Sequence, residues 1–542
     1  MISTAKLGMR FGAKTLFENV SLKFLPGECY GLIGANGAGK STFLKILSGE
    51  IDATEGEVIL EDGKTISVLS QNQFAYDEHK VLDTVLMGHK RIYALYKERM
   101  ELYAKPELTN EEGERVGELE EEFAELDGYT AEADAASMLN DLGIGNDMHS
   151  KLMSDLESGE KVRVLLAQAL FGNPDVLLLD EPTNQLDYYS VIWLENFLLN
   201  FKNTVLVVSH DRHFLNKVCT YMADVDFGEV RLFPGNYDFW QHSSELAVKQ
   251  QQDKNKKAEA KVKELEEFVR RFSANASKSK QATSRKKLIE KLRPDELPVS
   301  RRRAPFINFK PDRPCGNSVL RVTDISHSID GEKVLDKITF TLEKGQKIAI
   351  VGKNSLAKTT LLAILSGEIT PDSGDIHWGE SITQAYFPKD NSQYFEKNVP
   401  LIDWLGQYEE TGDQEILRGF LGRMLFSGDD ALKDVTVLSG GEKARAMFSK
   451  MMMEKGNVLL FDEPTDHLDL ESISALNTAL ETFDGCLLLT SHDFQLLNSV
   501  IDRVIEVSPN GMIDRQSTFE DYMQSDQVKS LQEKLYAKPS KV

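Results

Sequence analysis

Short apolar runs alternate along the chain with longer segments in which apolar residues recur every three or four positions. VLLL at 176–179 and CLLL at 486–489 are two of these runs, each of strand length. A buried parallel strand is apolar along its whole length, and the segment after it returns along the sheet as a helix. The pattern predicts an α/β fold with much parallel sheet. None of the runs approaches the roughly 20 apolar residues of a membrane-spanning helix.

The pattern occurs twice, with the same motifs in the same order. Three segments of the first half match three of the second half: 27–58 with 345–376, 173–187 with 456–469, and 204–216 with 486–498. Matches in one order predict two copies of one domain. We place the first copy at about 1–240 and the second at about 318–525, followed by a short tail at 526–542.

The first copy is longer than the second in one place. Gln71 to Leu156 is 85 positions, whereas the equivalent span from Lys389 to Leu438 is 49, so about 36 residues are inserted. The insertion lies near 88–135 and is helical in pattern and rich in charge. On pattern alone it is a solvated helical decoration.

The segment between the copies, at about 241–317, has a different character. Ala258, Val262, Leu265, Val269 and Phe272 recur at spacings of four and three, which is typical of a coiled-coil seam. A small, polar and basic stretch follows, and apolar character then resumes at 288–292. We predict a charged helical hairpin with a basic tip.

Charge is unevenly distributed along the 542 residues. The net charge is −23, yet Lys249 to Arg303 holds 18 basic and 8 acidic residues, a local balance of +10. The basic residues of the hairpin suit the phosphates of RNA, although a solvated linker between two domains has the same composition. We predict these as RNA-binding residues: Arg270, Arg271, Lys278, Lys280, Arg285, Lys286 and Lys287.

Four scattered cysteines form neither a disulfide framework nor a metal-binding spacing. The N-terminus has no apolar core of a signal peptide. Both observations favour a cytoplasmic protein.

GANGAGKST at 34–42 fits the phosphate-binding loop (P-loop, Walker A) pattern in full, between an apolar strand and a helix. Its glycines let backbone N–H groups turn inward around phosphate oxygens. Lys40 is predicted to reach the β- and γ-phosphates of ATP, and Ser41 to hold Mg²⁺. The predicted ATP-binding residues here are Gly34, Asn36, Gly37, Gly39, Lys40, Ser41 and Thr42.

The acidic half of such a site follows in VLLLDEP. Asp180 ends an apolar strand and is predicted to bind Mg²⁺, while Glu181 polarises the attacking water. His210 follows the strand TVLVVS and is placed to contact the γ-phosphate. A single histidine after a strand is more often structural. Because it recurs as His492 in the second copy, we favour a functional role.

The second copy departs from the pattern in its loop, VGKNSLAKTT at 351–360. Ser355 and Ala357 stand where the first copy has glycine, and either would cost on the order of 1 kcal/mol if held at positive φ. Gly352, Lys358, Thr359 and Thr360 remain as predicted ATP-binding residues, with Asp462 for metal and Glu463 and His492 for catalysis.

These motifs, together with LSGGEKAR at 438–445, resemble the ABC ATPase superfamily. The resemblance implies two domains facing head to tail, with ATP between the Walker A loop of one and the signature of the other. Site one would then pair the loop at 34–42 with Ser439, Gly440 and Gly441, with Phe11 stacking on adenine and Gln71 contributing to catalysis and metal binding. Both halves of site one are intact.

Site two would pair the loop at 351–360 with the first signature, LESGEKVR at 156–163. There Glu157 replaces serine, Lys389 replaces the glutamine equivalent to Gln71, and Asp330 replaces the stacking aromatic. Glu157 places negative charge near the γ-phosphate, which disfavours ATP. The hypothesis is one hydrolytic site and one weak or non-hydrolysing site; the alternative is two working sites with looser loops.

The tandem domains, the insertion and the linker stretch FVRRFSANASKSKQATSRKK resemble the ABC-F family, and the stretch is especially similar to its YbiT-like bacterial subgroup. That resemblance implies a translation factor at the ribosomal E site, with the linker reaching P-site tRNA and the insertion as an arm near the L1 stalk. It further implies a monomer whose two domains pair within one chain. Two alternatives remain: the fused ATPase subunit of a transporter, and an antibiotic-resistance clamp on the ribosome. A fused transporter ATPase does not need a basic helical hairpin between its domains, and intact Glu181 and His210 argue against a clamp that does not hydrolyse ATP.

Overall fold

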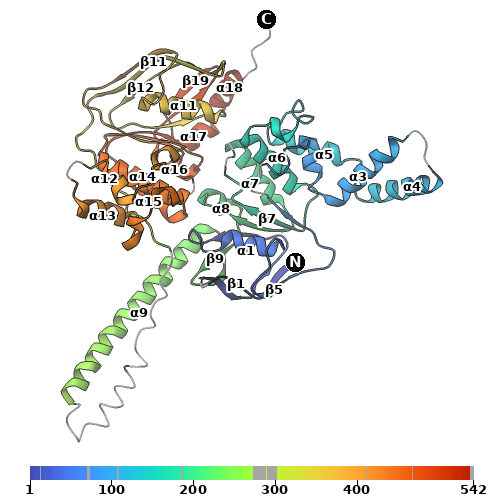
Figure 1. Cartoon of the computed structure of the whole chain (residues 1–542), viewed down its shortest axis with the longest axis horizontal. Helices are drawn as coiled ribbons and strands as arrows, with labels where there is room; N and C mark the ends of the chain where they lie inside the picture. The colour runs from blue at the N-terminus through green and yellow to red at the C-terminus, as the bar shows by residue number, and fades with distance from the viewer. Residues whose placement is uncertain are drawn as a thin grey trace.

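The computed structural model describes residues 1–536 except 13, 70–73, 106–108, 185, 187, 273–288, 290–301, 410, 411 and 467. It contains two α/β bodies beside each other, the first in blue to green and the second in yellow to red (Figure 1). The predicted α/β fold with two tandem domains and a linker between them is confirmed. Among the described residues, no helix is both long and apolar enough to cross a membrane.

Each body is built on a six-stranded sheet. In the first body the order is β10-β9-β4-β8-β7-β6, and in the second β15-β16-β17-β13-β18-β19. All neighbouring pairs are parallel except the outermost hairpins β9–β10 and β18–β19. The strands are β4 Cys29–Ile33, β6 Ile66–Val68, β7 Val176–Asp180, β8 Thr204–Val208, β9 Tyr221–Asp226, β10 Glu229–Pro234, β13 Lys347–Val351, β15 Gln384–Phe387, β16 Val458–Asp462, β17 Cys486–Thr490, β18 Arg503–Ser508 and β19 Gly511–Arg515.

Each body also has a smaller antiparallel sheet, which the sequence pattern did not predict. One contains β1, β2, β3 and β5, and the other β11, β12 and β14. One face of each sheet covers the P-loop helix and the other meets solvent, so that β12 alternates buried and exposed positions from Ile338 to its end. The strands are β1 Ile2–Phe11, β2 Lys14–Val20, β3 Lys23–Phe24, β5 Glu55–Leu60, β11 Ser318–Ile329, β12 Glu332–Glu343 and β14 Ser373–Trp378.

Helices cover the parallel sheets, and equivalent helices follow equivalent strands in the two bodies. In the first body they are α1 Lys40–Leu47, α2 Val81–Leu86, α5 Ala131–Asp141, α6 Ser158–Leu170, α7 Tyr188–Asn200 and α8 Arg212–Val218. In the second they are α11 Ser355–Ser366, α12 Leu401–Gly406, α13 Gln414–Arg423, α14 Gly440–Glu454, α15 Leu470–Glu481, α16 Phe494–Val500, α17 Phe519–Gln524 and α18 Asp526–Leu535.

The inserted residues of the first copy form α3 (Lys90–Tyr103) and α4 (Asn110–Glu125), which project from the first body (Figure 1). Ion pairs join the two helices, including Arg99 Nε to Glu120 Oε1 at 2.7 Å and Arg115 Nε to Glu98 Oε1 at 2.8 Å. Much of the charge of this arm is therefore neutralised within it.

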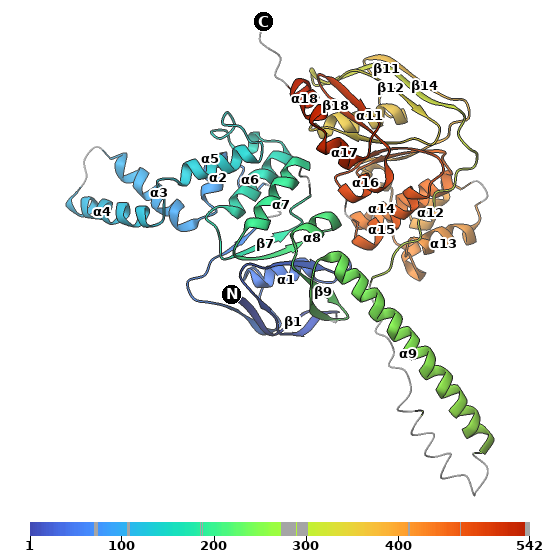
Figure 2. The same cartoon turned by 180° about the vertical axis from the view of Figure 1, so that it is seen from behind.

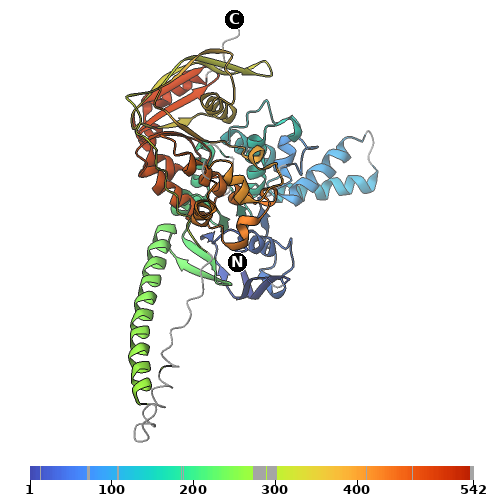
Figure 3. The same cartoon turned by 60° about the vertical axis from the view of Figure 1, so that its left-hand side comes forward.

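The linker begins with α9 (Tyr237–Phe272), a helix of 36 residues that includes the predicted coiled-coil seam. It leaves the bodies in a different direction from the arm in every view (Figures 2 and 3). The predicted second helix and basic tip lie outside the described residues apart from Ile289, which is helical.

The two bodies pack against each other through aromatic and aliphatic side chains. Leu470 of α15 belongs to the hydrophobic core of the first body. Tyr188 of α7 stacks on Phe494 with ring centroids 5.8 Å apart and meets Phe519 edge-on at 5.6 Å. The first turns of α7 and α15, which follow the strands β7 and β16, are therefore packed against the opposite domain.

Candidate nucleotide sites

The first P-loop joins β4 to α1. Gly34, Gly37 and Gly39 have φ of 156°, 72° and 109°, the left-handed region that glycine tolerates. A Cβ at Gly34 would lie 2.6 Å from the Val225 carbonyl oxygen, so glycine is required there for space as well. The Lys40 ammonium donates to the Gly34 carbonyl at 2.8 Å, which holds this side chain across the loop. Asn36 lies within the loop, and Ser41 and Thr42 lie in the first turn of α1.

The carboxylates of the first site stand at the end of β7, beside the end of β8. Asp180 is paired with Val208 in the sheet and is hydrogen-bonded by the Ser41 hydroxyl. Mg²⁺ prefers oxygen ligands, and these two side chains bring a hydroxyl and a carboxylate together. The donor set therefore fits a magnesium ion. Gln71, the third predicted ligand, lies outside the described residues.

Glu181 has a left-handed backbone, with φ of 52°, although it is not glycine. Such a conformation costs on the order of 1–3 kcal/mol and is concentrated at functional sites. Its equivalent Glu463 has φ of 47°, so both copies keep the same strained turn. The turn directs the side chain back toward His210, whose backbone N–H donates to Glu181 Oε2 at 3.2 Å.

Glu181 Oε1 lies 3.1 Å from His210 Nε2. Burial raises the pKa of Glu181 to about 7, opposed by the nearby Lys40 ammonium and reinforced by Asp180. Burial and Lys40 lower the pKa of His210 to about 3, so the imidazole is neutral at pH 7. A carboxyl that titrates near neutral pH has the properties of a general base for water.

Residues of the second domain lie close enough to act on this site. Burial lowers the pKa of Lys40, and the carboxylates of Asp469 and Glu471 oppose that shift. Asp469 likewise opposes the lowering of the His210 pKa. They flank Leu470, at the start of α15. Among the described residues, no hydrogen bond joins Ser439 to the first P-loop; Ser439 instead caps α14, accepting from the Glu442 N–H at 3.3 Å. Gly440 and Gly441 begin that helix, and Phe11, at the end of β1, is 54% exposed.

The second loop has a different conformation from the first. α11 begins at Ser355, whereas α1 begins only at Lys40, the equivalent of Lys358. The strain anticipated for a positive φ is absent, because Ser355 and Ala357 are helical. The Asn354 side chain caps this early turn by accepting from the Ala357 N–H at 3.1 Å. The positive φ of Gly34 is repeated at Gly352, whose φ is 150°.

Glu463, the equivalent of Glu181 in the second site, lies among basic side chains. Glu463 Oε1 lies 3.5 Å from Lys358 Nζ and 3.1 Å from His492 Nε2. Burial opposes ionisation, but His492, Lys358 and Lys389 together lower the pKa of Glu463. This is the opposite direction from Glu181. Asp462 accepts from the Thr490 hydroxyl at 2.6 Å and from Thr359. Thr360 is buried in α11.

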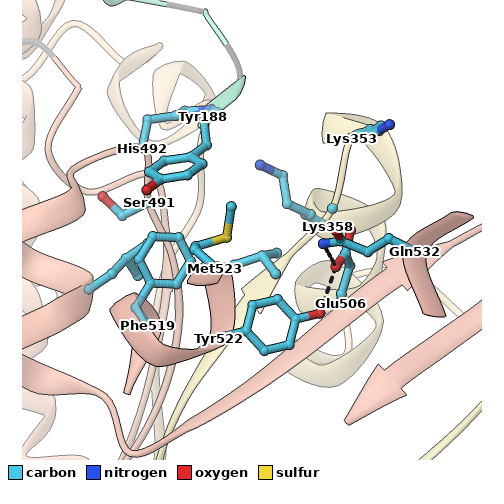
Figure 4. A pocket seen from close by; sticks show the side chains of 13 residues that line it. Tyr188, Lys353, Lys358, Ser491, His492, Glu506, Phe519, Tyr522, Met523 and Gln532 are labelled. Carbon is cyan, nitrogen blue, oxygen red and sulfur yellow. Dashed lines mark hydrogen bonds between the residues drawn. The ribbon is translucent and has the colours of Figure 1, made fainter. Parts of the chain in front are cut away.

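The C-terminal helices close one side of the second site around a small cavity of about 60 Å³ (Figure 4). Glu506, next to Val351 across the sheet, accepts hydrogen bonds from Tyr522 at 2.6 Å, Gln532 at 2.7 Å and Tyr536 at 2.7 Å. The Tyr536 hydroxyl in turn accepts from the Lys353 N–H at 3.2 Å. α17 and α18 thus hold the second loop from behind.

Sequence reasoning missed the equivalent cluster behind the first loop. Asp224 occupies the position of Glu506, next to Ile33 across the sheet. The Arg302 guanidinium lies 2.5 Å from Asp224, 3.8 Å from Glu471 and 4.5 Å from the Trp240 ring centroid. Arg302 is one of three consecutive arginines, so nothing local marked it. Only the repeat, which aligns Trp240 with Tyr522, carried a signal.

The predicted RNA-binding residues are only partly placed. Arg270 and Arg271 lie on the last turn of α9. The other five lie outside the described residues: Lys278, Lys280, Arg285, Lys286 and Lys287.

Comparison with known proteins agrees with this geometry. A family model described as ABC transporter matches residues 17–184 and 335–466, and a second model with that description matches 223–309. The chain is 56% identical to an uncharacterized ABC transporter ATP-binding protein YkpA of Bacillus subtilis, covering 99% of this chain and 100% of the relative. It is 46% identical to the probable ATP-binding protein YbiT of Escherichia coli O157:H7, covering 97% and 99%.

The fold is similar to a solved structure titled as the complex of archaeal ribosomal stalk protein aP1 and archaeal ribosome recycling factor aABCE1. The TM-score is 0.59 at 17% identity, with 98% of each chain covered. A structure titled ribosome-bound archaeal Pelota and ABCE1 matches with a TM-score of 0.52 at 18% identity, covering 98% of this chain and 86% of the other. The motifs, the tandem fold and the full-length relatives together show that the chain is an ATPase of the ABC transporter family, in the YbiT-like subgroup of its ABC-F branch.

Proposed function

We propose that this protein is an ATP-dependent translation factor that binds the ribosome near the E site and acts on P-site tRNA through its linker. The observation that carries the proposal is α9, a helix of 36 residues that projects from the ATPase body. At 1.5 Å per residue it is about 54 Å long. It leads to the most basic stretch of an acidic chain, which suits a probe for RNA phosphates.

The related structures support a ribosomal partner. Two of the similar folds carry titles that name ribosome recycling factor aABCE1 and ribosome-bound ABCE1. Those titles describe archaeal proteins of low sequence identity, so they support the proposal through architecture alone. The same architecture fits a monomer that pairs its two ABC domains within one chain and works in the cytoplasm.

We assign hydrolysis mainly to site one. In this proposal Lys40 holds the β- and γ-phosphates, Ser41, Gln71 and Asp180 hold Mg²⁺, and Glu181 accepts a proton from the attacking water. Mg²⁺, when bound, would neutralise charge that develops on the phosphates. The neutral His210 imidazole beside Glu181 would orient that carboxylate and contact the γ-phosphate.

The remaining assignments complete the proposal. Phe11 stacks on adenine, and Ser439, Gly440 and Gly441 complete site one when the domains close. We divide the chain into ABC domains at 1–240 and 318–525, an arm near 88–135, a linker at 241–317 and a tail at 526–542. The tip residues contact RNA: Arg270, Arg271, Lys278, Lys280, Arg285, Lys286 and Lys287.

Co-sedimentation with ribosomes tests the proposal. The Glu181→Gln variant should accumulate in the closed state, because it binds ATP but cannot accept the proton. It should pellet with ribosomes in ATP and not in ADP. Pelleting should weaken when five tip residues become alanine: Lys278, Lys280, Arg285, Lys286 and Lys287.

The control removes basic residues nearer the root of α9, by Lys254→Ala, Lys256→Ala and Lys257→Ala. Equal loss in both variants would mean a general charge effect and not recognition by the tip. Absence of pelleting despite ATP binding would refute the proposal and favour a transporter ATPase instead.

A further inference from the structure

The second site carries a lysine where the first copy has a glutamine predicted to bind metal: Lys389 stands in the place of Gln71. Lys389 Nζ donates to the Ser355 hydroxyl at 3.1 Å, so it reaches the loop itself. Lys353, in the place of Ala35, points away from Lys358 (Figure 4), and its Nζ lies 4.5 Å from the ring centroid of Tyr536, behind the loop.

The oxygen donors expected of a magnesium site are only partly present here. Thr359 and Asp462 are in contact, as Ser41 and Asp180 are in site one. The third position holds an ammonium group, which has no lone pair to donate to a metal. A fixed cation beside the loop also repels a divalent ion. The residues of site two therefore fit Mg²⁺ poorly.

Lys389 nevertheless brings positive charge to the loop, which is the electrostatic role that Mg²⁺ would have. The carboxylates that face this region are Asp462, Glu463 and Asp466, and Lys389 acts electrostatically on all three. Lysine is a common phosphate ligand that acts as a point charge.

We propose that the second site binds a nucleoside triphosphate without a metal ion, with Lys389 taking the electrostatic role of Mg²⁺. Without a metal, and with Glu463 paired to Lys358, the site holds ATP and does not hydrolyse it. The inference rests on the proposed assignment of residues 352–360 as a nucleotide site. It does not depend on ribosome binding.

Calorimetric titration of the full chain with ATP, in MgCl₂ or in EDTA, tests this inference. In Lys40→Ala protein, ATP binding at site one is lost and the titration measures site two. In Lys358→Ala protein, binding at site two is lost and the titration measures site one. Chelation should change the Kd of the Lys40→Ala protein by less than about threefold, and weaken the Lys358→Ala protein by about tenfold or more, as for loss of a charged contact.

Lys389→Gln in the Lys40→Ala background should restore dependence on Mg²⁺, with affinity in EDTA falling about 10- to 100-fold. Lys353→Ala is the matched control, because this exposed lysine faces Tyr536 behind the loop, and it should leave the effect of chelation unchanged. Circular dichroism checks that each variant is folded. The inference is overturned if folded Lys40→Ala protein binds no ATP, or loses it on chelation as sharply as the Lys358→Ala protein does. Because no ribosome is present, failure here leaves the translation proposal to its own test.

Discussion

Arg302 joins three parts of the molecule, and its removal should loosen the linker from the ATPase body. The guanidinium pairs with Asp224 at 2.5 Å and with Glu471 of the second domain at 3.8 Å, and it lies over Trp240, the last of these on α9. Arg302 is 12% exposed and Asp224 is 16% exposed, so solvent screens the pair weakly. We predict that Arg302→Ala frees the return segment that begins at 302.

The expected magnitude follows from burial. Removing one partner of a buried ion pair costs about 3–5 kcal/mol, because the other charge stays buried and unpaired. Burial already raises the pKa of Asp224, and Arg302 opposes that shift, so the variant's carboxyl takes up a proton more readily. This relief places the cost near the lower limit, about 3 kcal/mol, which is a change of roughly 100-fold in a local opening constant.

Native-state hydrogen exchange measures this opening directly. The Phe306 N–H donates to the Arg423 carbonyl at 2.8 Å and the Asp312 N–H to Lys455 at 3.0 Å, so both amides report whether the return segment is docked on the second domain. The Phe306 amide should exchange roughly 100-fold faster in Arg302→Ala protein. Arg303→Ala is the matched control, because Arg303 is exposed and its loss should change opening by less than about 0.5 kcal/mol.

Asp224→Asn provides the decisive partner variant. If the cost is the unpaired carboxylate, adding Asp224→Asn to Arg302→Ala should recover about 0.5–3 kcal/mol relative to the sum of the single changes. The reasoning would be refuted if the free-energy changes of the two single variants simply added in the double variant. It would also be refuted if the Phe306 amide exchanged equally fast in the Arg302→Ala and Arg303→Ala proteins.

Other predictions concern the two nucleotide sites. Glu181→Gln should lower kcat of ATP hydrolysis by about 10²- to 10⁴-fold, whereas Glu463→Gln should change it by less than about threefold, as a steady-state phosphate-release assay can show. Lys40→Ala should abolish most turnover and Lys358→Ala should leave most of it; equal losses would contradict the assignment of hydrolysis to site one. Since Glu181 must be ionised to act as a base and burial raises its pKa to about 7, kcat/KM should rise with pH through about 7 and be lost below it, in a pH–rate profile. Gly34→Ala should prevent ATP binding in a nucleotide-binding assay, because its Cβ would lie 2.6 Å from a carbonyl oxygen of β9.

Much of the site was accessible from sequence because its signals are local. A P-loop needs glycines at fixed offsets between a strand and a helix, and a catalytic carboxylate needs the end of a buried strand, so both are readable within about ten residues. Because the domain is repeated, each of these motifs occurs twice in the sequence. The α/β fold followed from apolar runs for the same reason, whereas the antiparallel sheets were missed because their strands carry only a weak alternation.

The conformation of the second loop was decided by contacts from far along the chain. Sequence suggested strain at Ser355 and Ala357, but the loop starts its helix early instead. Lys389, which is 34 positions from Ser355, donates a hydrogen bond to the Ser355 hydroxyl. The Tyr536 hydroxyl, 183 positions from Lys353, accepts a hydrogen bond from the Lys353 N–H. No local pattern contains such partners.

The sequence by itself determined that this is a tandem ABC ATPase, with one loop of full pattern and one altered, since those properties depend on neighbours along the chain. The tertiary structure alone decided which charges meet across the domains. Asp469 and Glu471 act on Lys40 from the second domain, and Arg302 ties the linker to both. The physical reason is that Coulomb interactions depend on distance in space and on burial, and both are set only when the two domains and the linker pack together.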